Sequence, residues 1–217
     1  MYKLHYSPDT ASLVVRVVLE ELGLPYEAIL IDRANHGLDA PGYRRLHPLG
    51  KIPAMETPEG PMFETAAILL WLADSNTALA PAPNSPERGA FLTWYFFTTS
   101  NIHPTLIQLF YPERTAGPEC AEAVRIAARK RMEELLAIIN TMVASKAPVW
   151  LSASQPSILG YYLGMLIRWM QFEGDDCYMP ATLFPALAPV LRAHAARPAA
   201  LAAARAEGIQ PLYVKAE

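Results

Sequence analysis

A proline stands inside an extended apolar segment of this chain, and it limits the kind of sheet that the chain can form. The segment reads Gly50-Lys-Ile-Pro-Ala-Met. Proline has no N–H to donate to a neighbouring strand. Pro53 is therefore out of place there unless the local backbone has a role other than hydrogen bonding to that strand. A cis Ile52–Pro53 bond is one such arrangement, because cis peptides concentrate at X–Pro bonds. We then expect the backbone N–H and C=O of Ile52 to face outward, where an extended ligand can pair with them.

Eleven residues after this proline, an acid and a hydroxyl open a helix. Glu64 and Thr65 precede the run Ala-Ala-Ile-Leu-Leu-Trp-Leu-Ala-Asp. The first N–H groups of a helix are unpaired, and the helix dipole is positive at that end. The two residues either bind a ligand or simply start and cap the helix. With the Ile-Pro step beside them, they indicate a small peptide-like ligand held by backbone on one side and by a helix end on the other.

The residue pattern changes near residue 80, which predicts two domains. The first part is expected to contain strands at 2–6, 26–31, 53–57 and 61–63, helices at 12–22 and 64–75, and an irregular region at 34–48. This order predicts a small mixed sheet with helices packed on it. A Pro- and Ala-rich linker at 80–86 follows, and then helical patterns at about 87–110, 118–145, 156–171 and 186–205. We therefore predict an α/β domain over 1–78 and an all-helical domain over 87–217.

Composition and charge exclude several classes of function. The net charge of −3 gives no bias toward nucleic acid, and no apolar run approaches the ~20 residues of a membrane span. The amino terminus shows no secretory signal, and Cys120 and Cys177 match no metal or redox spacing. We expect a soluble cytoplasmic protein with no metal and with neither nucleic acid nor membrane as a partner.

Five fragments together resemble the cytosolic glutathione S-transferases, and the resemblance covers nearly the whole chain. In chain order they are Tyr-Ser-Pro-Asp-Thr-Ala-Ser at 6–12, Leu-Glu-Glu-Leu-Gly-Leu-Pro-Tyr-Glu at 19–27, Gly-Lys-Ile-Pro-Ala at 50–54, the segment 64–74 and Ala-Arg-Pro-Ala at 196–199. The resemblance implies an α/β plus all-α fold, with a thioredoxin-like amino-terminal domain and an all-helical carboxy-terminal domain. It also implies glutathione as co-substrate, a hydrophobic small molecule as second substrate, a role in detoxification and, usually, a homodimer.

The resemblance assigns glutathione to the first domain. The backbone of Ile52 would pair with the cysteinyl part of glutathione, with Lys51 in the same binding segment and Pro53 as the cis proline. Glu64 and Thr65 would hold the γ-glutamyl end. That group carries an ammonium, which Glu64 can pair with, and a carboxylate, which suits a helix amino terminus and the Thr65 hydroxyl.

The turn before the first helix departs from the nearest pattern. Bacterial beta-class members typically read Ser-Pro-Gly-Ala-Cys-Ser, whereas this chain reads Ser-Pro-Asp-Thr-Ala-Ser at 7–12. Ala11 takes the place of the cysteine, which excludes a mixed-disulfide mechanism through that residue.

Three hydroxyls remain as candidate donors to the glutathione thiolate: Ser7, Thr10 and Ser12. We favour Thr10 or Ser12, although Ser12 is equally suited to be a helix N-cap and Thr10 to complete the turn. Asp9 would raise the pKa of the thiol if its carboxylate faced the sulfur, and we expect it either to point outward or to pair with a cation.

In the second domain the resemblance places two polar residues beside the second substrate. His103 matches a histidine of the beta-like pattern, Ser100 falls at a hydroxyl position, and Pro104 replaces a lysine. His103 is either a general base or donor, or a packed histidine at a helix end. Farther on, Ser157 is expected to cap a helix, but Gly160 cannot return the second bond of a capping box.

Two classes of function follow from these residues. One is a glutathione transferase that activates the thiolate for attack on a hydrophobic electrophile or, alternatively, serves as a glutathione-dependent reductase. The other is a non-catalytic member that keeps the fold as a binding or interaction module. Ala11, Asp9, Pro104 and Gly160 favour this second class.

Overall fold

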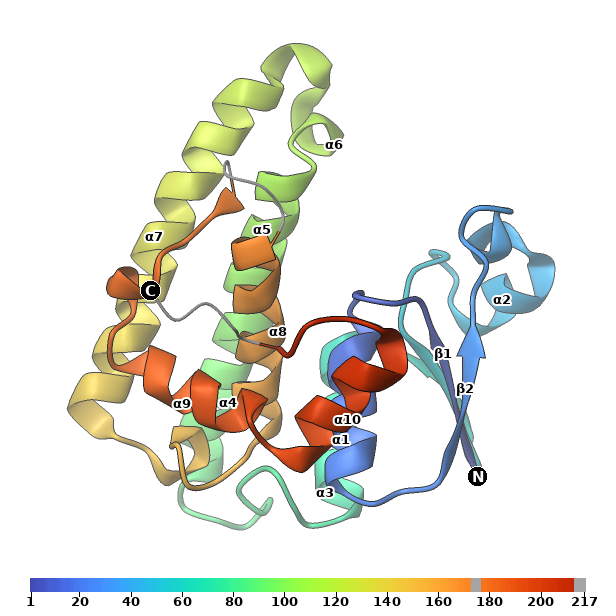
Figure 1. Cartoon of the computed structure of the whole chain (residues 1–217), viewed down its shortest axis with the longest axis horizontal. Coiled ribbons are helices and arrows are strands. Elements are labelled where there is room, and N and C mark those ends of the chain that lie inside the picture. Colours follow the sequence, from blue (N-terminus) through green and yellow to red (C-terminus); the bar gives the residue numbers. More distant parts are fainter. Residues whose placement is uncertain (173–176, 213–217) are drawn as a thin grey trace. The chain divides into compact units, whose positions relative to one another are not determined.

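The chain folds into two compact units, which Figure 1 shows in a computed structural model that describes residues 1–172 and 177–212. The first unit comprises residues 1–80 together with 196–212. The second comprises the described residues between 81 and 195.

The first unit is built on a four-stranded sheet. Its strands are β1 (Tyr2–Tyr6), β2 (Tyr26–Leu30), β3 (Ala54–Thr57) and β4 (Gly60–Phe63). They lie in the order β2-β1-β3-β4, with β1 parallel to β2 and the other two pairs antiparallel. The predicted mixed sheet is therefore confirmed.

Two longer helices, α1 (Ser12–Glu21) and α3 (Thr65–Ser75), contact each other in this unit. The region predicted to be irregular, 34–48, contains the 3₁₀ turn η1 (Gly37–Asp39) and the short helix α2 (Pro41–Leu46). The prediction was wrong there because Pro41, read as a breaker, is compatible with the first turn of a helix, where its missing N–H is not needed.

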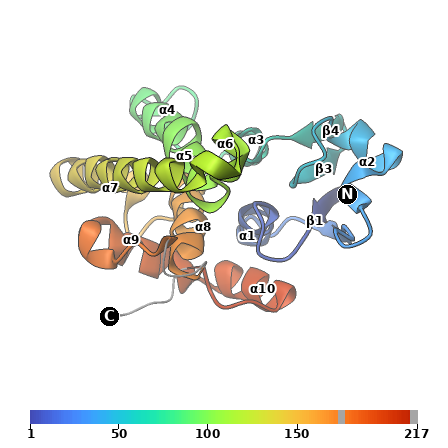
Figure 2. The same ribbon diagram turned by 90° about the horizontal axis from the view of Figure 1, so that it is seen from above.

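The carboxy-terminal segment joins the first unit, whereas the sequence predicted one helical domain over 87–217. Instead of one helix over 186–205, the structure has α9 (Leu187–Ala195) and α10 (Pro198–Glu207), because Pro198 begins a new helix. Helix α10 packs beside α1, as Figures 1 and 2 show. Its buried face consists mainly of alanines, which let two helices approach closely.

The second unit is helical. Its elements are α4 (Arg88–Phe97), the π-helical segment η2 (Thr98–Ile102), α5 (His103–Phe110), α6 (Glu113–Ala116), η3 (Pro118–Cys120), α7 (Ala121–Lys146), η4 (Val149–Leu151), α8 (Ile158–Phe172), η6 (Ala181–Leu183) and α9. Helix α5 contacts the long helix α7 (Figure 2). Within 1–172 and 177–212, no helix is both long and apolar enough to span a bilayer.

The start of α8 confirms Ser157 as a cap and explains the glycine beside it. The Ser157 hydroxyl accepts the Gly160 N–H at 3.1 Å. The buried ring of His194 lies where a side chain at 160 would stand, because a Cβ there would be 2.1 Å from Cε1 of His194. Nε2 of His194 lies 3.0 Å from the Ser152 carbonyl and 3.2 Å from the Gln155 carbonyl, so this nitrogen carries the hydrogen. His194 thus binds the loop before α8 through Nε2, while the other edge of its ring packs against Gly160.

Candidate functional site

The sheet register brings three of the predicted segments to one edge of the first unit. His5 pairs with Ala54, and Ala54 pairs with Phe63. The end of β1, the start of β3 and the end of β4 therefore lie side by side. The turn after β1, the Ile52–Pro53 step and Glu64 all adjoin these ends directly.

The Ile52–Pro53 peptide bond is cis, as predicted. Pro53 is buried, and the β3 ladder starts only at Ala54, so Ile52 lies just outside the sheet. The buried Tyr43 of α2 donates its hydroxyl to the Lys51 carbonyl at 2.5 Å, and burial raises the pKa of Tyr43 to about 12. This bond fixes the backbone immediately before Ile52. Tyr43 was not among the residues singled out from the sequence, since its hydroxyl acts across a loop that shows no periodicity.

Glu64 stands at the amino end of α3 in a backbone conformation that is rare for a residue with a side chain. Its φ is +70°, and its side chain makes no capping hydrogen bond to the helix, although its carbonyl accepts the Ile68 N–H at 3.0 Å. The Glu64 side chain is exposed, whereas Thr65 behind it is buried. Helix capping by the Glu64 carboxylate is therefore excluded. Residues held in such a conformation cluster at sites that bind ligands.

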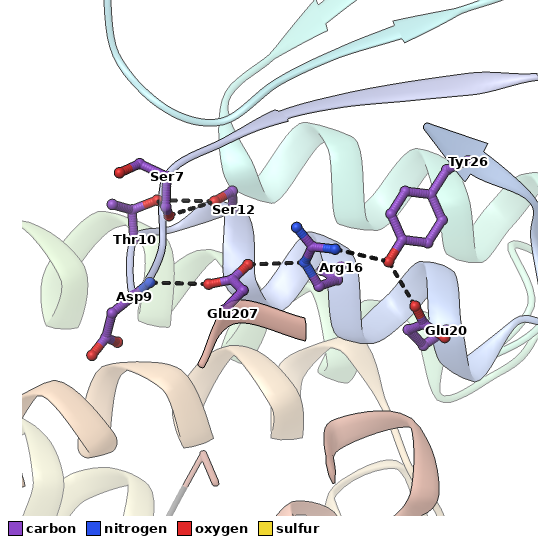
Figure 3. A network of polar contacts seen from close by, with 8 residues as sticks. All are labelled: Ser7, Asp9, Thr10, Ser12, Arg16, Glu20, Tyr26 and Glu207. Carbon is purple, nitrogen blue, oxygen red and sulfur yellow. Dashed lines mark hydrogen bonds and ion pairs between the residues drawn. The ribbon is translucent and has the colours of Figure 1, made fainter. Parts of the chain in front are cut away.

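The turn after β1 carries the three candidate donors, Ser7, Thr10 and Ser12, and it brings the hydroxyls of Thr10 and Ser12 to the Ser7 carbonyl (Figure 3). The Thr10 hydroxyl donates to the Ser7 carbonyl at 2.8 Å, and the Ser12 hydroxyl lies 3.3 Å from the same oxygen. The two hydroxyls are 2.9 Å apart. Ala11 occupies the N-cap position, and Ser12 is the first residue of α1, so the alternative role of Ser12 as an N-cap is wrong.

Asp9 turns its carboxylate away from these hydroxyls, as Figure 3 shows. Its φ is +54°, in the left-handed region that aspartate tolerates better than most residues. Its backbone N–H donates to Oε2 of Glu207, at the end of α10, at 3.0 Å. The Asp9 carboxylate therefore does not face the candidate thiolate donors.

A buried polar network connects this turn to α10, and sequence reasoning missed it. Oε1 of Glu207 accepts from Nε of Arg16 at 2.9 Å, and Arg16 also donates to the Tyr26 hydroxyl at 3.2 Å. Tyr26 in turn donates to Glu20 at 2.6 Å (Figure 3). Burial raises the pKa of Glu207, and the Asp9 amide and Arg16 only partly offset this effect. The sequence holds one sign of this network, which is a single arginine among the valines of α1. Its partner lies 191 residues away.

The two residues expected near the second substrate lie in the helical unit. Ser100 is exposed within the π-helical segment η2, a form of helix that occurs often at functional sites. His103 begins α5, and its Nδ1 lies 2.6 Å from the Tyr162 hydroxyl, with the Trp169 ring centroid 6.0 Å away. These contacts favour a packed histidine at a helix end over a general base or donor. Within the described residues, no group of three His, Cys, Asp or Glu side chains is arranged to hold a metal ion.

Comparison with known proteins shows which class of protein shares this fold. Residues 11–75 match the family model of the glutathione S-transferase amino-terminal domain. Relatives and solved structures of the glutathione S-transferase superfamily extend this similarity over most of the chain.

Individual relatives match over most of the chain. Glutathione S-transferase GST-4.5 of Xanthomonas campestris is 26% identical over 177 residues, which are 80% of this chain and 85% of that protein. Glutathione S-transferase GstA of Escherichia coli O157:H7 is 28% identical over 77% of this chain and 81% of its own length. The solved structure of a Burkholderia graminis glutathione transferase, with two glutathione molecules bound per subunit, is 28% identical. It covers 93% of this chain and 86% of that one, with a TM-score of 0.79.

Proposed function

We propose that this chain is a glutathione transferase and that glutathione binds at the sheet edge formed by the first unit. The observation that carries the proposal is the meeting of a cis Ile52–Pro53 step, the exposed Glu64 at φ +70° and the hydroxyl-bearing turn at one edge. The Ile52 backbone, with Lys51 beside it, pairs with the cysteinyl part. Glu64 pairs with the γ-glutamyl ammonium, and Thr65 and the start of α3 receive the carboxylate.

Activation of the thiol requires a donor near the sulfur. A free thiol has a pKa of about 8.5 and is mostly protonated at neutral pH. Lowering this pKa by ~2 units takes ~2.7 kcal/mol of preferential stabilisation of the thiolate. Thr10 is half-buried at the turn, whereas Ser12 is wholly buried and Ser7 nearly so. The accessible hydroxyl of Thr10 is therefore the proposed donor.

The absence of a cysteine at position 11 favours conjugation over a disulfide relay. Conjugation needs only a glutathione thiolate and an electrophile, whereas a mixed disulfide needs a thiol on the protein. The proposal extends to a hydrophobic electrophile as second substrate, with the exposed Ser100 as the residue of the helical unit that faces it. His103 is not proposed as a general base, because its Nδ1 lies 2.6 Å from the Tyr162 hydroxyl. The proposal also includes a homodimer and a cytoplasmic location.

Two measurements test the proposed function. We expect the protein to be retained on immobilised glutathione and to accelerate the reaction of glutathione with a chromogenic aryl halide. Failure to bind glutathione at millimolar concentration would sink the proposal. Binding without conjugation would instead favour a glutathione-dependent reductase, if disulfide substrates are turned over, or a non-catalytic binding protein, if they are not.

Replacing Thr10 by alanine is expected to raise the pKa of the bound glutathione thiol by about 1–2 units, because a hydrogen bond to a charged acceptor contributes about 1.5–3 kcal/mol. The ultraviolet absorbance of the thiolate, followed against pH, measures this pKa. At neutral pH, kcat/KM for the aryl halide should fall by about 3- to 25-fold, because the fraction of glutathione present as thiolate falls by this factor. Thr10→Ser keeps the hydroxyl and should retain most of the effect. An unchanged thiol pKa in Thr10→Ala would show that Thr10 is not the donor.

A further inference from the structure

The hydroxyls of Thr10 and Ser12 share a single acceptor, and this arrangement restricts what each can do. Each hydroxyl has one hydrogen to donate. The shorter contact, 2.8 Å, joins Thr10 to the Ser7 carbonyl, so the Thr10 hydrogen is committed to that oxygen when no ligand is bound. The Ser12 hydroxyl lies between two acceptors, the Thr10 oxygen at 2.9 Å and the Ser7 carbonyl at 3.3 Å.

The two side chains also differ in their access to a ligand. Ser12 has no exposed surface, while Thr10 is partly exposed at the turn. Figure 3 shows both hydroxyls on the same side of the turn, close to the Ser7 carbonyl. A bound sulfur can therefore reach Thr10 without touching Ser12. Any effect of Ser12 on the thiolate must pass through Thr10 or through the Ser7 carbonyl.

Donation by Thr10 to a thiolate has a cost in this geometry. The Thr10 hydrogen must leave the Ser7 carbonyl, and Ser7 is itself 8% exposed. A buried carbonyl that loses its donor is penalised. The Ser12 hydroxyl is the group placed to remove this penalty, since it already lies within hydrogen-bond distance of the same oxygen.

We propose that Ser12 is a positioning residue that takes over the Ser7 carbonyl when Thr10 turns its hydrogen to the glutathione thiolate. This inference rests on the proposed function and adds a second hydroxyl to it. Before glutathione binds, Thr10 donates to Ser7 and Ser12 donates to Thr10. After binding, Thr10 donates to the sulfur and Ser12 donates to Ser7. No hydrogen is transferred between heavy atoms, because only the orientations of two hydroxyls change.

This positioning role and two simpler roles for Ser12 have different consequences. If Ser12 were itself the thiolate donor, its removal would raise the thiol pKa whether or not Thr10 were present. If Ser12 only filled space at the start of α1, its removal would lower the affinity for every ligand by the same factor and leave the thiol pKa unchanged. A positioning role requires that the effect of Ser12 depend on Thr10.

A double-mutant cycle tests the proposal with wild type, Ser12→Ala, Thr10→Ala and the double variant. The first measurement is the pKa of the bound glutathione thiol, from thiolate absorbance. The second is the affinity for S-methylglutathione, which has no thiol to ionise. Ser12→Ala should raise the thiol pKa by about 0.7–1 unit, a 5- to 10-fold loss of thiolate relative to thiol, because one acceptor goes unpaired.

The double variant separates the possible outcomes. In the Thr10→Ala background, we expect Ser12→Ala to have no further effect on the thiol pKa, and in all four proteins the affinity for S-methylglutathione should stay within about 2-fold. Additive effects, or no effect of Ser12→Ala, would overturn the inference and leave the proposed function standing. Failure of the wild type to bind glutathione or S-methylglutathione would overturn both. Ser12→Thr keeps the hydroxyl and supplies a further variant. It should restore the low thiol pKa, and its failure to do so while still binding S-methylglutathione would count against the proposal.

Discussion

Replacing Gly160 by alanine is expected to destabilise the protein by about 2–3 kcal/mol, although alanine is the better helix former. The added Cβ would lie 2.1 Å from Cε1 and 2.2 Å from Nδ1 of His194. The ring cannot move away easily, because His194 is buried and its Nε2 is bonded to the carbonyls of Ser152 and Gln155. The midpoint and slope of urea unfolding would measure the loss of stability.

Gly164 provides a matched control on the same helix. Apart from its chain neighbours and the backbone of its own helix, a Cβ at this buried position meets no atom within 4 Å, so Gly164→Ala should stabilise the protein by up to about 1 kcal/mol through helix propensity. Removing the His194 ring should also remove the loss of stability that Gly160→Ala causes. Gly160→Ala combined with His194→Ala should be no less stable than His194→Ala alone. A double variant that shows the full sum of the two single losses would contradict the steric explanation.

Replacing Glu64 by glutamine is expected to weaken glutathione binding by about 10- to 100-fold, because it removes the negative charge from a charge-assisted hydrogen bond. Glu64 is exposed at the sheet edge, and its carboxylate makes no capping bond to α3. The change should therefore leave the helix start intact. Isothermal titration with glutathione measures the affinity, and an unfolding curve verifies that stability is retained.

The ligand supplies the matching test for the role of Glu64. An analogue of glutathione that lacks the γ-glutamyl ammonium should bind the wild type about as weakly as glutathione binds Glu64→Gln. That analogue should lose little further affinity in the variant, since the partner of the carboxylate is already missing. Glu27→Gln, an exposed acid on strand β2, serves as the control for a general charge effect. Equal losses for both ligands in Glu64→Gln would mean that Glu64 does not contact the ammonium.

Local features of the fold could be predicted because their causes are local. The breaks at turn residues, the helical spacing of α1 and the cap at Ser157 each depend on residues within a few positions of one another. The cis bond before Pro53 belongs to the same group, because the tertiary amide that precedes a proline has only a small preference for the trans form. For the same reason, an amino-terminal α/β domain followed by helices could be predicted from the order of elements.

The parts that could not be predicted depend on residues far apart in the chain. The Arg16–Glu207 pair, the bond from the Asp9 amide to Glu207 and the fit of His194 against Gly160 join positions 34 to 198 residues apart. Sequence spacing carries no information about such pairs, because they form only when helices pack. The place of α10 in the first unit could not be predicted for the same reason. Its buried alanines pack against α1, and nothing in the spacing of these alanines identifies α1 as their partner.

Residue identity and order were enough to establish the family resemblance, the residues proposed to hold glutathione and the loss of the cysteine at Ala11. They left Thr10 and Ser12 as equal candidates for the thiolate donor. Packing in three dimensions separated the two, because burial and hydrogen-bond distance are properties of the folded chain. Ser12 has no exposed surface and lies within hydrogen-bond distance of the Ser7 carbonyl, whereas Thr10 reaches the surface of the turn. Accessibility, not residue type, decides which hydroxyl can meet a ligand.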